Sequence, residues 1–123
     1  MSKKPFILVV EDDEWMARQH IRTLRAAGIQ AEYVGHALAA MDALDARMPD
    51  VIVLDVLLPG PNAFTLLHEL RSHADLAAIP VVLCTNSADS LAKKDLSAYG
   101  VKMILDKTTM QPRDLVAAVK RVL

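Results

Sequence analysis

The chain has 123 residues, of which 53% are hydrophobic and 24% are charged, and its formal net charge is −1. This length and composition are typical of one globular domain, and the near-neutral charge gives no electrostatic basis for binding nucleic acid. We therefore expect a single domain over residues 1–123 that does not itself contact DNA or RNA.

The start of the chain and its single cysteine bear on location. An apolar run at residues 6–10 ends at Glu11, so it is too short for the core of a signal peptide or for a bilayer span. Cys84 has no partner for an internal disulfide, and its apolar neighbours indicate a core residue rather than a nucleophile. These features predict a cytoplasmic protein without membrane insertion.

Apolar segments of strand length alternate along the chain with segments of helix length. Strands are predicted at residues 6–10, 31–34, 51–55, 81–85 and 101–105. Helices are predicted at residues 14–27, 37–47 and 90–99, from a cap at Asn62, and from Pro112 onward. Parallel strands joined in this way need right-handed crossovers that put helices on both faces of the sheet. The predicted fold class is α/β, a doubly wound parallel sheet of five strands with five helices.

The helix patterns also predict which side chains face the core. The inward candidates are Trp15, Ile21 and Leu24 in the first helix, and Leu38, Met41 and Leu44 in the second. The histidines show no metal-ligand spacing, so we interpret them as surface or partly buried residues; they are His20, His36, His68 and His73.

Polar residues follow or end four of the predicted strands. Glu11 and Asp12 follow the first strand, Asp55 ends the third, Thr85 ends the fourth and Lys107 follows the fifth. Because the carboxyl ends of parallel strands meet at one edge of the sheet, these residues should converge on one site.

The residue types at this edge point to phosphoryl transfer. Clustered carboxylates repel one another unless a cation neutralises them, and Mg²⁺ is a hard cation that takes carboxylate and phosphate oxygens. With that ion bound, Asp55 can attack phosphorus as a carboxylate nucleophile. Lys107 would neutralise phosphoryl oxygens, and the hydroxyl of Thr85 would donate a hydrogen bond to one of them. We therefore predict that Asp55 is a phosphoryl acceptor.

The chain resembles the receiver domains of two-component response regulators. The matching segments are residues 7–13, 53–60, 81–85 and 104–107, and the resemblance covers essentially the whole chain. It implies a flavodoxin-like fold with strand order 2-1-3-4-5 and a phosphoacceptor role for Asp55. It implies a magnesium site made by Glu11, Asp12, Asp55 and the backbone carbonyl of Leu57.

The resemblance also implies partners. A histidine kinase or a histidine phosphotransfer protein would donate the phosphoryl group, and a downstream protein or an effector would respond to it. By the same resemblance, residues 90–123 would form the output surface. We expect the domain either to act alone through such partners or to belong to a longer protein.

Three residues depart from the usual receiver pattern. Thr108 follows Lys107 where receivers usually have a proline in a cis peptide; a cis bond to a non-proline residue costs about 2.5–4 kcal/mol, so we predict a trans bond here. Ile104 takes the place of a tyrosine or phenylalanine that swings inward on activation, so that aromatic switch is absent. Asn86 stands where a small residue is usual.

Other functional classes share parts of this pattern. A flavin or nucleotide binder needs a glycine- or hydroxyl-rich phosphate loop after the first strand, where this chain has acids. A phosphatase resembling the haloacid dehalogenases needs a second aspartate two residues after the first, where Leu57 stands. The remaining alternative is a receiver-like adaptor that binds a partner without being phosphorylated.

Overall fold

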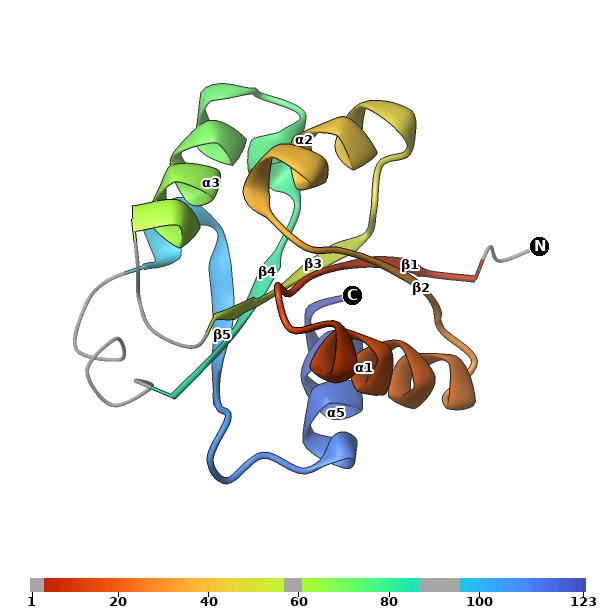
Figure 1. The fold of residues 1–123 in the computed structure, drawn as a ribbon. Helices are drawn as coiled ribbons and strands as arrows, with labels where there is room; N and C mark the ends of the chain where they lie inside the picture. Colours follow the sequence, from red (N-terminus) through yellow and green to blue (C-terminus); the bar gives the residue numbers. More distant parts are fainter. Residues whose placement is uncertain (1–3, 57–60, 87–95) are drawn as a thin grey trace.

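The structure, a computed structural model, describes residues 4–56, 61–86 and 96–123, and Figure 1 shows its fold. The elements in chain order are β1 (Phe6–Val10), α1 (Glu14–Ala26), β2 (Gln30–Val34), α2 (Ala37–Ala46), β3 (Val51–Val56), α3 (Pro61–Ser72), the 3₁₀ turn η1 (Leu76–Ala78), β4 (Val81–Thr85), the 3₁₀ turn η2 (Ser97–Tyr99), β5 (Val101–Asp106) and α5 (Pro112–Val122).

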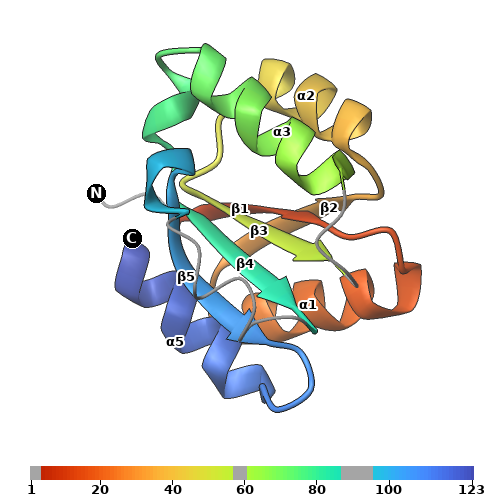
Figure 2. The same cartoon turned by 90° about the vertical axis from the view of Figure 1, so that its left-hand side faces the viewer.

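The strands form one five-stranded sheet in the order β2-β1-β3-β4-β5, with every neighbouring pair parallel. Helices α1 and α5 cover one face of the sheet, and α2 and α3 cover the other (Figures 1 and 2). The doubly wound α/β class and the flavodoxin-like strand order are therefore confirmed.

The central strands are apolar because both of their faces are covered. Alternate residues of a strand point to opposite faces, so β1 sends Leu8 into the core under α2 and α3 and Ile7 into the core under α1 and α5. Cys84 of β4 belongs to the second of these cores and is fully buried, and burial raises the pKa of its thiol. The prediction that Cys84 is a core residue is confirmed.

Helix number and helix bounds differ in part from the prediction. The described residues contain four α-helices rather than five. Most of the helix predicted at residues 90–99 lies outside the described residues, and its described end, Ser97–Tyr99, is a 3₁₀ turn closed by Gly100 at φ 82°. Helix α3 begins at Pro61, so Asn62 lies inside the helix rather than at its cap. Among the described helices none is long and apolar enough to cross a membrane.

Two predicted core residues, Trp15 and Leu38, instead face solvent. They are 66% and 72% exposed, whereas Leu24 and Leu44 are buried as predicted. An α-helix turns about 100° per residue, so Trp15 lies about 180° around α1 from Leu24. Spacings of three residues also drift around the helix, which puts Leu38 about 120° from Leu44 on α2.

Candidate functional site

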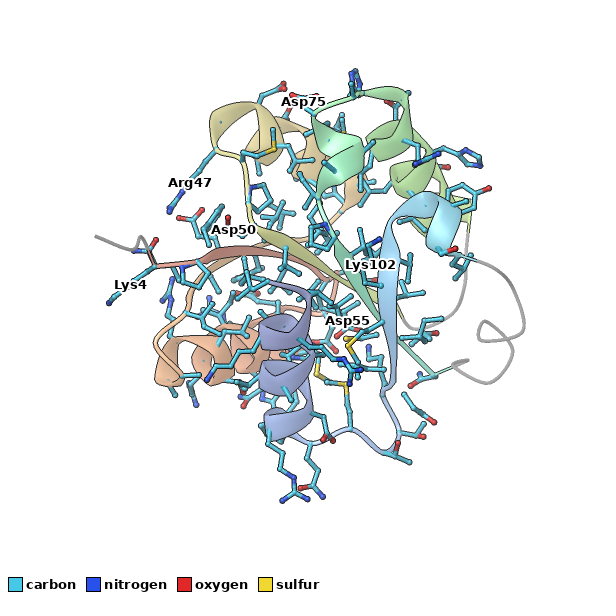
Figure 3. All side chains as sticks on the ribbon, turned by 180° about the vertical axis from the view of Figure 1, so that it is seen from behind. Lys4, Arg47, Asp50, Asp55, Asp75 and Lys102 are labelled. Carbon is cyan, nitrogen blue, oxygen red and sulfur yellow. The ribbon has the colours of Figure 1, made fainter. Side chains whose placement is uncertain are left out.

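The carboxyl edge of the sheet brings together three of the predicted site residues, Glu11, Asp55 and Lys107. Asp55 is the penultimate residue of β3, Glu11 directly follows β1 and Lys107 directly follows β5. Asp55 is 3% exposed and lies within the fold (Figure 3), and Glu11 is 1% exposed. Parallel pairing of the strands thus places two buried carboxyl groups beside one lysine.

Lys107 connects these carboxyl groups. Its ammonium nitrogen Nζ lies 2.5 Å from Asp55 Oδ1 and 3.9 Å from Glu11 Oε2, and its side chain is 7% exposed. The backbone nitrogen of Lys107 donates a hydrogen bond of 3.0 Å to the carbonyl oxygen of Thr85. This backbone bond ties Lys107 to the end of β4, and from there its side chain reaches Asp55 near the end of β3.

A fourth group, His20 of α1, was not among the predicted site residues. Its ring nitrogen Nε2 lies 2.5 Å from Asp55 Oδ2, and the residue is 6% exposed. The interpretation of His20 as a surface or partly buried residue is therefore wrong. The helical spacing in the sequence could have indicated that His20 is buried. His20 lies three residues after Ala17 and four before Leu24, on the face of α1 that packs inward.

The environment changes the proton affinity of both carboxyl groups. Burial, and then the charge of Asp55, raise the pKa of Glu11 from 4.5 to about 8. Burial alone would also raise the pKa of Asp55, but the hydrogen bond from His20 and the contact with the Lys107 ammonium outweigh it, so this pKa lies below 3.8. At neutral pH the site therefore holds an ionised Asp55.

The other residues that the sequence singled out differ in how deeply they are buried. Thr85 is the last residue of β4 and is fully buried, whereas Asp12 is exposed. Ile104 of β5 is partly buried against the core under α2 and α3, and Asn86 is exposed in the turn after β4. Leu57, predicted to offer its backbone carbonyl, lies outside the described residues.

Asp13, which was left out of the predicted metal set, caps α1. Its side chain accepts a hydrogen bond of 3.1 Å from the backbone nitrogen of Met16. Its own backbone nitrogen donates a bond of 3.0 Å to Glu11 Oε1. The start of α1 therefore fixes one oxygen of Glu11 and leaves Oε2 to face Lys107.

The donor atoms present fit a magnesium ion. Glu11 Oε2 is a buried carboxyl oxygen with no hydrogen-bond partner among the described residues, and Asp55 Oδ1 faces the Lys107 ammonium. No three His, Cys, Asp or Glu side chains in the described ranges meet as a complete metal site. Mg²⁺ needs no such cage, because it uses one or two carboxylates together with waters and phosphate oxygens.

Thr108 shapes the loop after β5 in the place of the usual proline. No peptide bond in the described segments is cis, so the prediction of a trans Lys107–Thr108 bond is confirmed. The backbone nitrogen and the hydroxyl of Thr108 both donate to Asp106 Oδ1, at 2.9 and 2.6 Å. These two bonds lower the pKa of Asp106 below 3.8. The loop that carries Lys107 is thus closed by Asp106 and Thr108.

Replacing Thr108 by valine should raise the pKa of Asp106, because valine keeps the backbone donor and loses the hydroxyl. A lowered pKa stabilises the folded state above pH 3.8, and that contribution is lost as the pH falls through the folded value. Wild type and Thr108→Val should therefore differ in stability at neutral pH and converge in acid. An NMR titration of the Asp106 carboxyl carbon measures the shift. Thr109→Val is the control, and an unchanged Asp106 pKa in Thr108→Val would contradict the assignment.

Comparison with known proteins agrees with this architecture. The sequence matches the response regulator receiver domain family over residues 7–120. It is 32% identical over 119 residues to the transcriptional regulatory protein BaeR of Escherichia coli, and 32% identical over 117 residues to the transcriptional regulatory protein GltR of Pseudomonas aeruginosa. These matches cover 97% and 95% of this chain but 48% of each relative. The chain spans about half the length of these curated relatives.

Two solved structures match this chain over 89% and 100% of their own length. The signal receiver domain of a signal transduction histidine kinase from Syntrophus aciditrophicus is 30% identical, with a TM-score of 0.80 over 97% of this chain and 89% of that one. The chemotaxis protein CheY4 of Vibrio cholerae shares the fold, with a TM-score of 0.86 at 24% identity over 98% of this chain and 100% of that one. The chain therefore belongs to the response regulator receiver domain family of two-component signal transduction.

Proposed function

We propose that this receiver domain is a phosphoacceptor in which Asp55 takes a phosphoryl group from a phosphohistidine in a Mg²⁺-dependent reaction. The donor is a histidine kinase or a histidine phosphotransfer protein in the cytoplasm. The phosphorylated domain then changes its binding to a downstream protein or effector, without itself contacting nucleic acid. The observation that carries this proposal is the 2.5 Å contact between the buried Asp55 carboxylate and the Lys107 ammonium.

Each residue of the site has a separate task in this reaction. The Asp55 carboxylate is the nucleophile, and its low pKa keeps it ionised at neutral pH. Lys107 already contacts Oδ1, so its charge lies where the oxygens of an incoming phosphoryl group would gather. Thr85, buried at the end of the neighbouring strand, would donate its hydroxyl to one of those oxygens.

The carboxyl groups would also hold the metal ion. Glu11, Asp12 and Asp55, with the Leu57 carbonyl, are the proposed ligands, and the unpartnered Glu11 Oε2 supports the first of them. When bound, Mg²⁺ would offset the negative charge on the phosphoryl oxygens. A bound Mg²⁺ would also add positive charge at a place where two carboxyl groups lie beside a single lysine.

The phosphorylated state would act on the rest of the domain through Thr85 and Lys107, the two groups next to the new phosphoryl oxygens. The aromatic switch of many receivers is not part of this route, because Ile104 holds that position and packs against the core under α2 and α3. We expect residues 90–123 to form the surface that the partner recognises.

The test is phosphate uptake by the purified chain. We expect incubation with a small phosphodonor and MgCl₂ to add the mass of one phosphoryl group, as measured by intact mass spectrometry. Excess EDTA should prevent the addition, because it removes the ion that would offset the negative charge on the phosphoryl oxygens. The added group should be lost on treatment with hydroxylamine, which cleaves acyl phosphates.

The same measurement separates the proposal from the adaptor alternative. An adaptor that binds its partner without phosphorylation would gain no mass under either condition. A gain in mass that is equal with MgCl₂ and with EDTA would support a phosphorylated protein but contradict the magnesium requirement.

A further inference from the structure

His20 is a polar side chain on an otherwise apolar helix face. The buried residues of α1 are Ala17, His20, Ile21 and Leu24, and His20 alone among them has a polar side chain. Burying an imidazole costs free energy unless it forms a hydrogen bond. The ring forms that bond with Asp55 Oδ2, 35 positions away along the chain, at 2.5 Å.

The direction of this hydrogen bond follows from the proposed function, in which Asp55 reacts as a carboxylate. An ionised carboxylate can only accept hydrogen bonds, so His20 Nε2 must carry the hydrogen and donate it. His20 therefore stabilises the negative charge of the group that would receive the phosphoryl group.

The contacts also distinguish the two oxygens of Asp55. Oδ2 is held by His20 and Oδ1 faces the Lys107 ammonium. Since Lys107 supplies the charge for the phosphoryl oxygens, Oδ1 is the oxygen placed to bond to phosphorus. Oδ2 then becomes the carbonyl oxygen of the acyl phosphate and remains beside His20.

We propose that His20 is a positioning residue that shortens the lifetime of the phosphoryl group on Asp55 by donating a hydrogen bond to Oδ2. This inference rests on the proposed function. In the hydrolysis step, the oxygen of a water molecule bonds to phosphorus as the bond between phosphorus and Oδ1 breaks. The electron pair of the broken bond returns to the Asp55 carboxylate, the water releases a proton to solvent, and inorganic phosphate leaves.

The effect arises because the strength of the bond from His20 changes during this step. A hydrogen bond to a carboxylate is roughly twice as strong as one to a neutral carbonyl oxygen. The donor therefore stabilises the departing carboxylate more than it stabilises the acyl phosphate, and hydrolysis becomes faster. In the reverse direction the same bond makes the carboxylate a weaker nucleophile, so phosphate uptake becomes slower.

The first test compares the lifetime of the phosphorylated protein in wild type and in His20→Leu. Leucine has a similar volume and cannot donate a hydrogen bond. We expect the lifetime, measured from the loss of added mass after removal of the phosphodonor, to increase on the order of three- to tenfold. Uptake from a small phosphodonor should become faster by a smaller factor.

Three further variants separate the hydrogen bond from packing. His20→Gln keeps an N–H donor at a similar reach, so its lifetime should lie within about twofold of wild type. Ile21→Val changes the packing of the same helix next to His20, and we expect it to leave the lifetime unchanged. His20→Met is a second apolar replacement, so a failure of His20→Leu to fold would not decide the outcome. Thermal unfolding of each variant shows that it is folded.

The outcomes distinguish this inference from the proposed function. If wild type takes up no phosphate, the proposed function fails and this inference fails with it. If wild type is phosphorylated but the folded His20→Leu or His20→Met protein loses phosphate as fast as wild type or faster, only the role of His20 is overturned. A lifetime in His20→Gln equal to that in His20→Leu would overturn it as well, because the donor would then have no effect.

Discussion

Replacement of Asp55 by asparagine is expected to abolish phosphate uptake. Asparagine has nearly the same size, so the buried position at the end of β3 stays filled, but its neutral amide oxygen is a poor nucleophile. Intact mass spectrometry after incubation with a phosphodonor and MgCl₂ should show no added mass, while wild type gains one phosphoryl group. The change also removes the negative charge that Lys107 and His20 contact.

Asp45→Asn is the matched control for this variant. Asp45 is exposed on α2, a helix that contributes no residue to the candidate site, so the same chemical change there removes a carboxylate outside the site. We expect the control to take up phosphate like wild type. Acid-labile phosphate in Asp55→Asn would refute Asp55 as the acceptor, and digestion of wild type should place the phosphoryl group in the peptide that contains Asp55.

Replacement of Lys107 by methionine is expected to slow phosphate uptake by at least about 100-fold, which is the usual size of the effect when one preorganised charge or donor at a reacting group is removed. Methionine keeps the length of the side chain and removes the ammonium. Asp55 and Glu11 then face each other without a balancing charge, so the pKa of the nucleophile rises and the incoming phosphoryl oxygens meet no cation from the protein. The rate of mass gain under a fixed phosphodonor concentration measures the effect.

Lys102→Met provides the control for this second prediction. Lys102 is an exposed residue of β5, on the same strand that carries Lys107 to the site (Figure 3). Uptake in this control should equal that of wild type. A Lys107→Met protein that is folded and takes up phosphate at the wild-type rate would show that the ion pair with Asp55 serves folding alone.

The parts of the fold that could be predicted are those fixed by short-range patterns. The strands β1 and β4 were predicted with their observed bounds. Both are continuous apolar runs of five residues, which is typical of a strand with both faces buried and too short for an ordinary helix. The convergence of Glu11, Asp55 and Lys107 also followed from the sequence, because parallel strands bring their carboxyl ends to one edge. The strand order came from the family resemblance.

The parts that could not be predicted depend on packing between elements. Whether an apolar residue such as Trp15 is buried depends on how its helix is rotated about its own axis against the sheet. The spacing of the apolar residues in the sequence does not determine that rotation. The contact between His20 and Asp55 depends on where α1 crosses the sheet, which the sequence of α1 alone does not determine. Thr108 was predicted to have a trans bond on energetic grounds, but its hydrogen bonds to Asp106 appear only in three dimensions.

The sheet order has a consequence for how the protein acquires its site during folding. The groups around Asp55 come from α1, from the end of β1 and from the end of β5, which is an edge strand and the last strand to be synthesised. Contacts between residues so distant in the chain form late, because the entropy of closing long loops must be overcome first. A folding intermediate without β5 would hold the carboxyl groups of Glu11 and Asp55 with no ammonium between them. The proposed phosphorylation of Asp55 would therefore require the completed domain, because a chain in which β5 has not docked lacks the Lys107 ammonium beside Asp55.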